Sequence, residues 1–234
     1  MEGEGGDKAD IELPTVQQRL VRAMHATGKP VVFVNCSGSA IAFASIEDQY
    51  DALLQAWYPG QGGAKALADV LFGDYNPAGR TTQTWVSDIL DLPNMLDYDI
   101  RHGRTYMYFK GKPIFPFGYG LSYTSFKYSG LKASRDGDDF VFRFQLKNTG
   151  SRDGEEVVQL YATFQGDDAA RRLRGFERVA VAAGETKEVE IRVPADDLKL
   201  WDEAQHAFAF KGRSARIQIG ASSADIRLKK RIRF

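Results

Sequence analysis

Apolar residues recur at helical spacing in the segment that follows Pro14. In VQQRLVRAMHATG, spacings of three and four residues place four apolar side chains on one helix face: Val16, Leu20, Ala23 and Met24. Pro14 suits the first turn, where its missing N–H is not needed, and Gly28 suits the end of a helix. The pattern therefore predicts an amphipathic helix between these two residues.

Extended and helical patterns then alternate up to about residue 120. PVVFVNC (30–36) is a continuous apolar run, typical of a strand covered on both faces. A short helical stretch at 40–49 precedes a second strand candidate, DALLQAW (51–57). GGAKALADVLFG (62–73) is an amphipathic helix ended by glycine, and GRTTQTW (79–85) is a third extended piece. This rhythm predicts an α/β part with a partial, open, mostly parallel sheet and flanking helices.

Residues 81–125 are a loop-rich connector that contains Pro93, Pro113 and Pro116. Within it, FPFGYGLSYTSF (115–126) combines five aromatic residues with two glycines. Such a cluster fits either a sugar-stacking platform or a packed connection between two domains. We favour the packed connection.

From about residue 126 the period of the apolar residues changes to two. DFVFRFQLK (139–147) places Phe140, Phe142, Phe144 and Leu146 on one face, and Val141, Arg143, Gln145 and Lys147 on the other. Four later segments also have the character of strands: 155–164, 187–194, 215–220 and 225–234. Strands at this spacing predict an all-β, immunoglobulin-like sandwich. The lack of a Cys…Trp…Cys pattern favours a fibronectin type III-like sandwich.

Charge adds little to this picture. Lys plus Arg and Asp plus Glu both number 31, so no global field draws the chain to nucleic acid or to an anionic membrane. Only RLKKRIRF (227–234) is locally basic.

No run of about 18 apolar residues occurs, which predicts no membrane helix. Charged residues and glycine follow Met1, where a signal peptide would be apolar. Either the protein is not exported by that route or its natural start lies upstream, so the compartment stays open.

Cys36 is the single cysteine, which excludes an internal disulfide and a multi-cysteine zinc site. It follows an apolar run and is expected to be an inert residue at the end of a strand. A nucleophilic cysteine needs a paired histidine, and His25, His102 and His206 lie in unpromising contexts. No metal ligand set and no cofactor motif are expected.

Several motifs, taken in order, resemble glycoside hydrolase family 3, which contains β-glucosidases and β-xylosidases. The motifs are EGEGGDKADIELPTVQQRL, KPVVFVNCSGS, AWYPGQGGAKALADVLFGDYNPAGR, FPFGYGLSYTSF, NTGSRDGEEVVQLY and LRGFERVAVAAGET. The resemblance covers the C-terminal part of such enzymes. It implies an N-terminally truncated α/β sandwich domain over residues 1–120, including the connector 81–125, and a fibronectin type III-like domain over 126–234.

The resemblance implies a retaining, exo-acting β-glycosidase that removes terminal β-linked glucose or xylose. Retaining hydrolysis needs two carboxyl groups about 5 Å apart. The family pattern aligns Glu4 with the acid/base, and Glu2 is the second candidate in the same loop; Asp7 and Lys8 would anchor it. The nucleophile would belong to an N-terminal TIM barrel, which needs about 200 residues or more and has no room in this chain. We therefore expect the chain alone to be inactive and to need that missing barrel as its partner.

The remaining conspicuous residues have structural interpretations. Trp57 is expected in a core, Trp201 in the packing of the sandwich, and His102 on the surface. Arg101 and Arg104 could reach an active site or could brace the connector.

Two other function classes stay open on the residues alone. A non-catalytic carbohydrate-binding or scaffolding module would explain the missing nucleophile. A nucleotide-binding α/β domain is disfavoured, because G-x-G-x-x-G must follow a strand. Intact members of the resembled family are often periplasmic or secreted.

Overall fold

The computed structural model describes residues 10–234. These residues form two compact units, and the connector contributes to both. The first unit contains residues up to 75 together with 83–98 and 110–115; the second contains 76–82, 99–109 and 116–234. Each unit has its own hydrophobic cluster.

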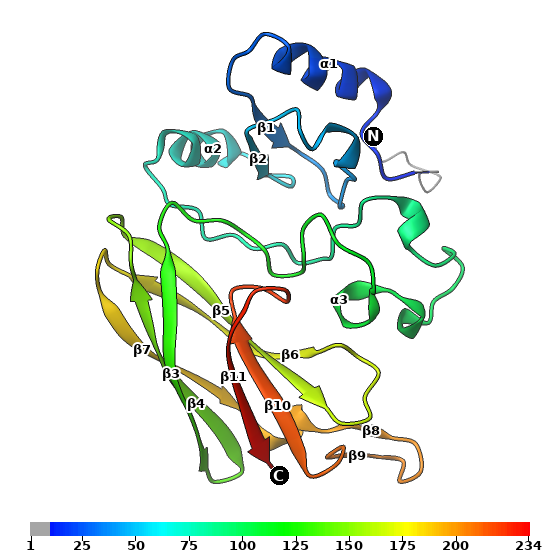
Figure 1. The fold of residues 1–234 in the computed structure, drawn as a ribbon, viewed down its shortest axis with the longest axis vertical. Helices are drawn as coiled ribbons and strands as arrows, with labels where there is room; N and C mark the ends of the chain where they lie inside the picture. The colour runs from blue at the N-terminus through cyan, green and yellow to red at the C-terminus, as the bar shows by residue number, and fades with distance from the viewer. Residues whose placement is uncertain (1–9) are drawn as a thin grey trace. The chain divides into compact units, whose positions relative to one another are not determined.

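The first unit is an α/β structure built around a small parallel sheet (Figure 1). It contains α1 (Thr15–His25), β1 (Val32–Asn35), the 3-10 turn η1 (Ala44–Ile46), β2 (Ala52–Gln55), α2 (Gly63–Phe72) and η2 (Ile89–Asp91). β1 and β2 are parallel, with Asn35 opposite Gln55. Gly73 ends α2 in the left-handed conformation at φ 82°, as predicted. The order of strands and helices predicted for residues 14–73 is therefore confirmed.

Three details of that part differ from the prediction. The apolar face of α1 is exposed, and Val21, on another face, is the buried residue of the helix. Val32 of β1 is 48% exposed, so the strand is not covered on both faces as predicted. No strand forms over 79–85; only Trp85 makes a single bridge, to Phe115.

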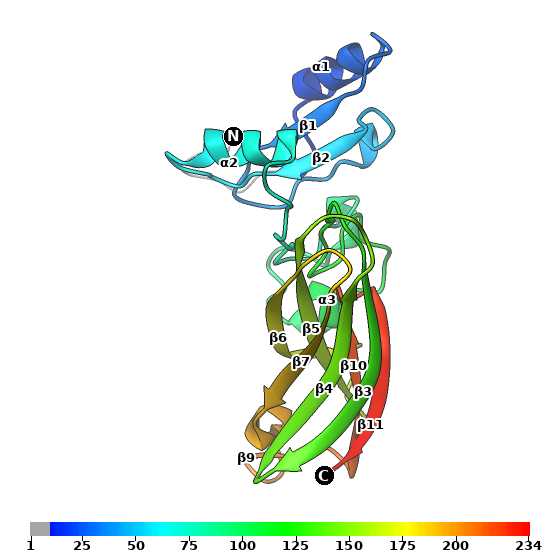
Figure 2. The ribbon, with the colours of Figure 1, turned by 90° about the vertical axis from the view of Figure 1, so that its left-hand side faces the viewer.

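The second unit is a sandwich of two antiparallel sheets that face each other (Figure 2). One sheet has the order β3-β4-β7 and the other β11-β10-β5-β6. Their bounds are β3 (Phe126–Asp136), β4 (Asp139–Asn148), β5 (Gly154–Phe164), β6 (Arg172–Val181), β7 (Thr186–Val193), β10 (Ser214–Gly220) and β11 (Ile226–Arg233). η4 (Ala195–Leu198) and the hairpin of β8 (Leu200–Asp202) and β9 (Ala207–Ala209) link β7 to β10. The predicted sandwich is thus confirmed, with β3 and β6 added to the predicted strands.

The core of the sandwich follows the period of two. All four residues predicted for one face of β4 are buried: Phe140, Phe142, Phe144 and Leu146. They meet side chains from β5, β7 and β10, among them Leu160, Ile191 and Ile217. Val141 is buried too, on the opposite face of β4.

Connector segments pack on β5 through buried polar contacts. This region also contains η3 (Ile100–His102) and α3 (Thr105–Tyr108). Arg80 and Glu156 form an ion pair of 2.8 Å with both side chains less than 10% exposed. Burial raises the pKa of Glu156 and outweighs the lowering effect of Arg80. The buried Gln159 amide donates to the carbonyl oxygens of Gly118 (3.0 Å) and Ala221 (2.8 Å).

Candidate functional site

The predicted acid/base candidates, Glu4 and Glu2, lie outside the described residues, as do Asp7 and Lys8. The structure begins at Asp10, directly after the acidic, glycine-rich segment. What it does describe is how the chain leaving that segment is held.

Residues 11–13 are fixed against the rest of the first unit. The Ala42 amide donates to the Ile11 carbonyl oxygen at 2.8 Å, and Glu12 forms a parallel bridge with Ala42. The Ser45 hydroxyl donates to the Glu12 carboxylate at 2.9 Å. Leu13 is only 5% exposed. The acidic segment therefore joins the unit at an ordered, hydrogen-bonded position.

A polar network lies where β1 and β2 end. The Asn35 amide, 6% exposed, donates to Gln55 Oε1 at 2.6 Å and to the Ser37 hydroxyl at 2.8 Å. The Gln55 amide donates to the Ser37 carbonyl oxygen at 3.0 Å. Ser37 in turn donates to the carbonyl oxygen of Ser39 at 2.8 Å.

This edge is the usual ligand position of an α/β sheet, because ligands bind outside the carboxyl ends of parallel strands. Its groups are neutral donors and acceptors, so they can orient a polar ligand but cannot exchange protons near neutral pH. This network was not predicted from the sequence. The signal was present: an amide residue ends each apolar run, and the predicted strands are parallel.

Aromatic side chains pack beside this edge. Trp85 is 1% exposed, stacks on Phe43 with ring centroids 5.6 Å apart, and contacts Trp57 and Phe115 edge-on. Trp57 is partly buried against the same cluster, so its predicted place in a core is confirmed. Its φ of 54° is a strained conformation for a bulky residue. Trp85 Nε1 has no acceptor among the described residues.

The arginines and histidine of the connector belong to the second unit. Arg101 donates to both oxygens of Asp99, and these hydrogen bonds hold the pKa of Asp99 well below its usual value. The side chain of His102 is 60% exposed, so its predicted surface position is confirmed. Arg104 precedes the first residue of α3. Arg101 thus forms a local pair within the connector, and both roles considered for it stay predictions.

Cys36 was predicted at the end of a strand and Trp201 in the packing of the sandwich; the structure confirms the first position and not the second. Cys36 is exposed and follows the last residue of β1, as expected for a residue at the end of a strand. The prediction for Trp201 is wrong: its side chain is 49% exposed and packs edge-on against Phe208 in the β8–β9 hairpin. That hairpin is a separate two-stranded sheet outside both layers of the sandwich, so Trp201 does not enter the core.

Within residues 10–234, no helix is long and apolar enough to cross a membrane. No three His, Cys, Asp or Glu side chains of these residues gather in a way that could hold a metal ion.

Comparison with known proteins gives matches along both parts of the chain. The model of the glycosyl hydrolase family 3 C-terminal domain matches residues 1–123, and that of a fibronectin type III-like domain matches 156–223. A xylan 1,4-beta-xylosidase of Xylanibacter ruminicola is 44% identical over 231 residues, which are 97% of this chain. A periplasmic beta-glucosidase of Salmonella typhimurium is 34% identical over 97% of this chain.

Solved structures agree with these matches. DesR, a beta-glucosidase from Streptomyces venezuelae in complex with D-glucose, superposes with a TM-score of 0.89 at 32% identity over 98% of this chain. A beta-D-glucoside glucohydrolase from Trichoderma reesei gives 0.92 at 28% identity over 99% of it. The chain spans only 27% of the Xylanibacter relative and 32% of the Salmonella relative, and 32% and 37% of these two solved chains.

Proposed function

The chain belongs to glycosyl hydrolase family 3, and we propose that it is the C-terminal part of a retaining, exo-acting β-glycosidase. One observation carries this proposal: the family match begins at residue 1 and runs through the whole α/β part, so it includes the acidic, glycine-rich segment. In this proposal residues 1–120 are the α/β domain and residues 126–234 the fibronectin type III-like domain.

Glu4 is the proposed acid/base, with Glu2 as the second candidate. In retaining hydrolysis this group protonates the leaving oxygen and later activates water, while a second carboxylate attacks the sugar. The proton donor must be held within hydrogen-bond reach of the leaving oxygen. The anchored residues 11–13 supply a fixed end for its loop, which supports this role.

The nucleophile and most of the substrate site would come from an N-terminal barrel domain. The relatives named above are more than three times as long as this chain and include enzymes named for xylosides and for glucosides. We therefore propose a terminal β-linked xylose or glucose as the substrate.

The first test is the chain alone, incubated with an aryl β-xyloside and an aryl β-glucoside. We expect no turnover above background, because one carboxyl group cannot complete a two-carboxylate mechanism. Turnover that disappears in Glu4→Gln would contradict the division of roles between two domains.

The second test places this chain, fused in frame, behind the N-terminal part of the Xylanibacter relative. In the fusion, Glu4→Gln should lower the hydrolysis of a methylumbelliferyl glycoside by about 10²- to 10⁴-fold, the usual contribution of a general acid. A dinitrophenyl glycoside needs little protonation of its leaving group, so its first step should be affected far less. Asp10→Asn is the matched control and should retain full activity.

The outcomes separate the candidates. If Glu2→Gln lowers hydrolysis of the methylumbelliferyl glycoside far more than that of the dinitrophenyl glycoside, and Glu4→Gln lowers neither, then Glu2 is the acid/base. If the fusion folds correctly and binds saccharide but hydrolyses neither substrate, the alternative of a non-catalytic binding module would be favoured.

A further inference from the structure

The outer face of the larger sheet has a basic region at β10 and β11. Ala215, Ile217 and Ile219 of β10 are buried in the core, so the residues between them face outward. One of these is Arg216, and its partner directly across the strand pair is Arg231. Both side chains are exposed.

The two arginines are an unfavourable pair as they stand. Like charges directly opposite each other in an antiparallel sheet are destabilising. Within residues 10–234, neither guanidinium forms an ion pair with a carboxylate; Arg231 Nε donates to the Ser214 hydroxyl at 3.1 Å instead. Asp167, in the loop after β5, is already paired with Arg172. The positive charge here is therefore available to an external anion.

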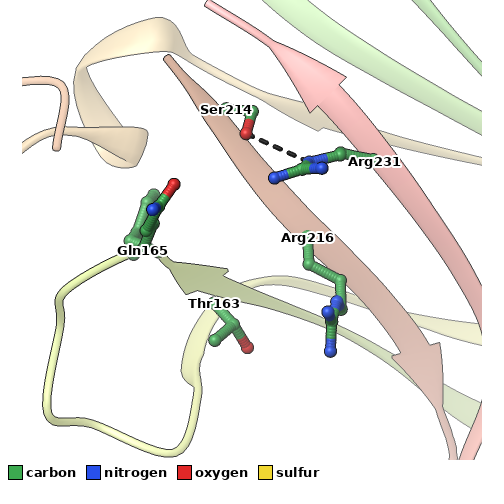
Figure 3. A pocket seen from close by; sticks show the side chains of 6 residues that line it. Thr163, Gln165, Ser214, Arg216 and Arg231 are labelled. Atoms are coloured by element: carbon green, nitrogen blue, oxygen red, sulfur yellow. Dashed lines mark hydrogen bonds between the residues drawn. The ribbon is translucent and has the colours of Figure 1, made fainter. Parts of the chain in front are cut away.

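The arginines line a hollow of about 360 Å³ together with Thr163, Phe164, Gln165 and Ser214. Figure 3 shows Arg231 reaching toward Ser214, while Thr163 and Gln165 come from β5 and the residue after it. The guanidinium of Arg216 points away from that of Arg231, so the two forked cationic donors face different parts of the hollow, which hydroxyl and amide groups also line. This combination can bind an anionic group and neighbouring hydroxyl groups at the same time.

We propose that this hollow, the arginine-pair site, binds the carboxylate of an acidic sugar unit in an oligosaccharide. The planar guanidinium matches a carboxylate with two parallel hydrogen bonds, and Thr163, Ser214 and Gln165 suit the hydroxyl groups of a sugar ring. The choice of a sugar as the carrier of the carboxylate rests on the proposed function. The site itself lies in the sandwich and takes no part in the hydrolysis.

Calorimetric titration of the chain tests this site. The probes are a xylo-oligosaccharide carrying one glucuronic acid, the neutral xylo-oligosaccharide of the same length, and inorganic phosphate. We expect binding of the acidic oligosaccharide only, weakened at least tenfold by Arg216→Gln and by Arg231→Gln. The matched control is the double variant Lys127→Gln with Lys147→Gln. These two lysines are exposed and lie directly opposite each other, like the arginines, but on the other sheet.

Three results would overturn the proposal. The first is equal binding of the neutral and the acidic oligosaccharide, and the second is no binding of either. The third is phosphate binding that is as strong as that of the acidic oligosaccharide and depends on the same arginines. If the lysine control weakens binding of the acidic oligosaccharide by the same factor, the effect comes from net charge alone, and the proposal is overturned as well. Because removal of one arginine relieves repulsion, the melting temperature of Arg216→Gln should stay the same or rise, so a loss of binding cannot be assigned to unfolding. Glu4→Gln should bind normally, which keeps this test independent of the hydrolysis tests.

Discussion

At the scale of single residues, Asp167 shows how burial and an ion pair compete. Burial alone would raise its pKa, but the hydrogen bonds and charge of Arg172 hold the pKa below its usual value. Arg172 donates from Nε and Nη2 to the two Asp167 oxygens at 2.8 and 2.9 Å. Arg172 also donates to the hydroxyl of Tyr108 at 3.1 Å, so the pair ties the loop after β5 to α3.

This pair predicts a pH-dependent stability. A carboxyl group with a lowered pKa in the folded state stabilises above its unfolded pKa, near 4, and loses this effect as the pH falls through the folded value. Asp167→Asn should therefore cost about 1.5–3 kcal/mol at pH 7, the typical value of a charged hydrogen bond. The difference from the parent should shrink steadily below about pH 4.

Urea unfolding of both proteins between pH 2 and 8 measures this difference. Asp196→Asn is the control, because the Asp196 side chain is 83% exposed in its ion pair with Lys199 and should change stability little at any pH. A constant difference between Asp167→Asn and its parent across the whole range would contradict the assignment.

At the scale of elements, the connector meets β5 at a position where glycine is strongly favoured. Gly118 has φ 79°, and a Cβ atom there would lie 2.0 Å from Gln159 Oε1. Gln159 is 3% exposed and also accepts from the Tyr161 hydroxyl at 2.6 Å. A side chain at Gly118 would therefore displace an amide that holds the connector and the loop after β10 together.

Gly118→Ala and Gly137→Ala form a matched pair. Both glycines have positive φ, but a Cβ atom at Gly137 would meet nothing within 4 Å. Gly137→Ala should cost about 1 kcal/mol from backbone strain alone, and Gly118→Ala should cost a further 1–3 kcal/mol from overpacking. Thermal unfolding of the two variants measures the difference, and equal losses would show that the Gln159 amide moves aside freely.

The elements also show what the sequence could predict. The period of two in 139–147 identified the buried face of β4, and Gly73 identified the end of α2, because both signals are local. β3 and β6 were missed: β3 is interrupted by a register shift between Ser129 and Lys132, and most of β6 is exposed or half-buried. The Asn35–Gln55 contact depends on the parallel register, a long-range property that neither residue reveals alone.

At the scale of the whole molecule, an apolar surface remains on the first unit. Val16, Leu20 and Met24 of α1 are 75%, 62% and 52% exposed, although they share one face of the helix. Exposed apolar patches mark interaction surfaces or sites of aggregation. In the proposed longer enzyme, the N-terminal domain would offer a surface against which this face could pack.

We therefore expect the isolated chain to self-associate, and Leu20→Glu to reduce this association. Gln17→Glu is the matched control, since it adds the same charge at another exposed position of α1 without removing apolar area. Sedimentation velocity at increasing concentration measures the monomer fraction. A parent chain that stays monomeric and melts cooperatively would overturn the expectation.

The exposed Cys36 gives the molecule a built-in attachment point. It is the chain's single thiol, and it sits between Asn35 and Ser37 in the polar network at the sheet edge. A maleimide fluorophore would thus label one position without any prior substitution, and its emission would report directly on whatever approaches that edge. The approach of the proposed N-terminal domain, supplied as a separate chain, could then be followed in real time by stopped-flow fluorescence, even with substrates that are never cleaved.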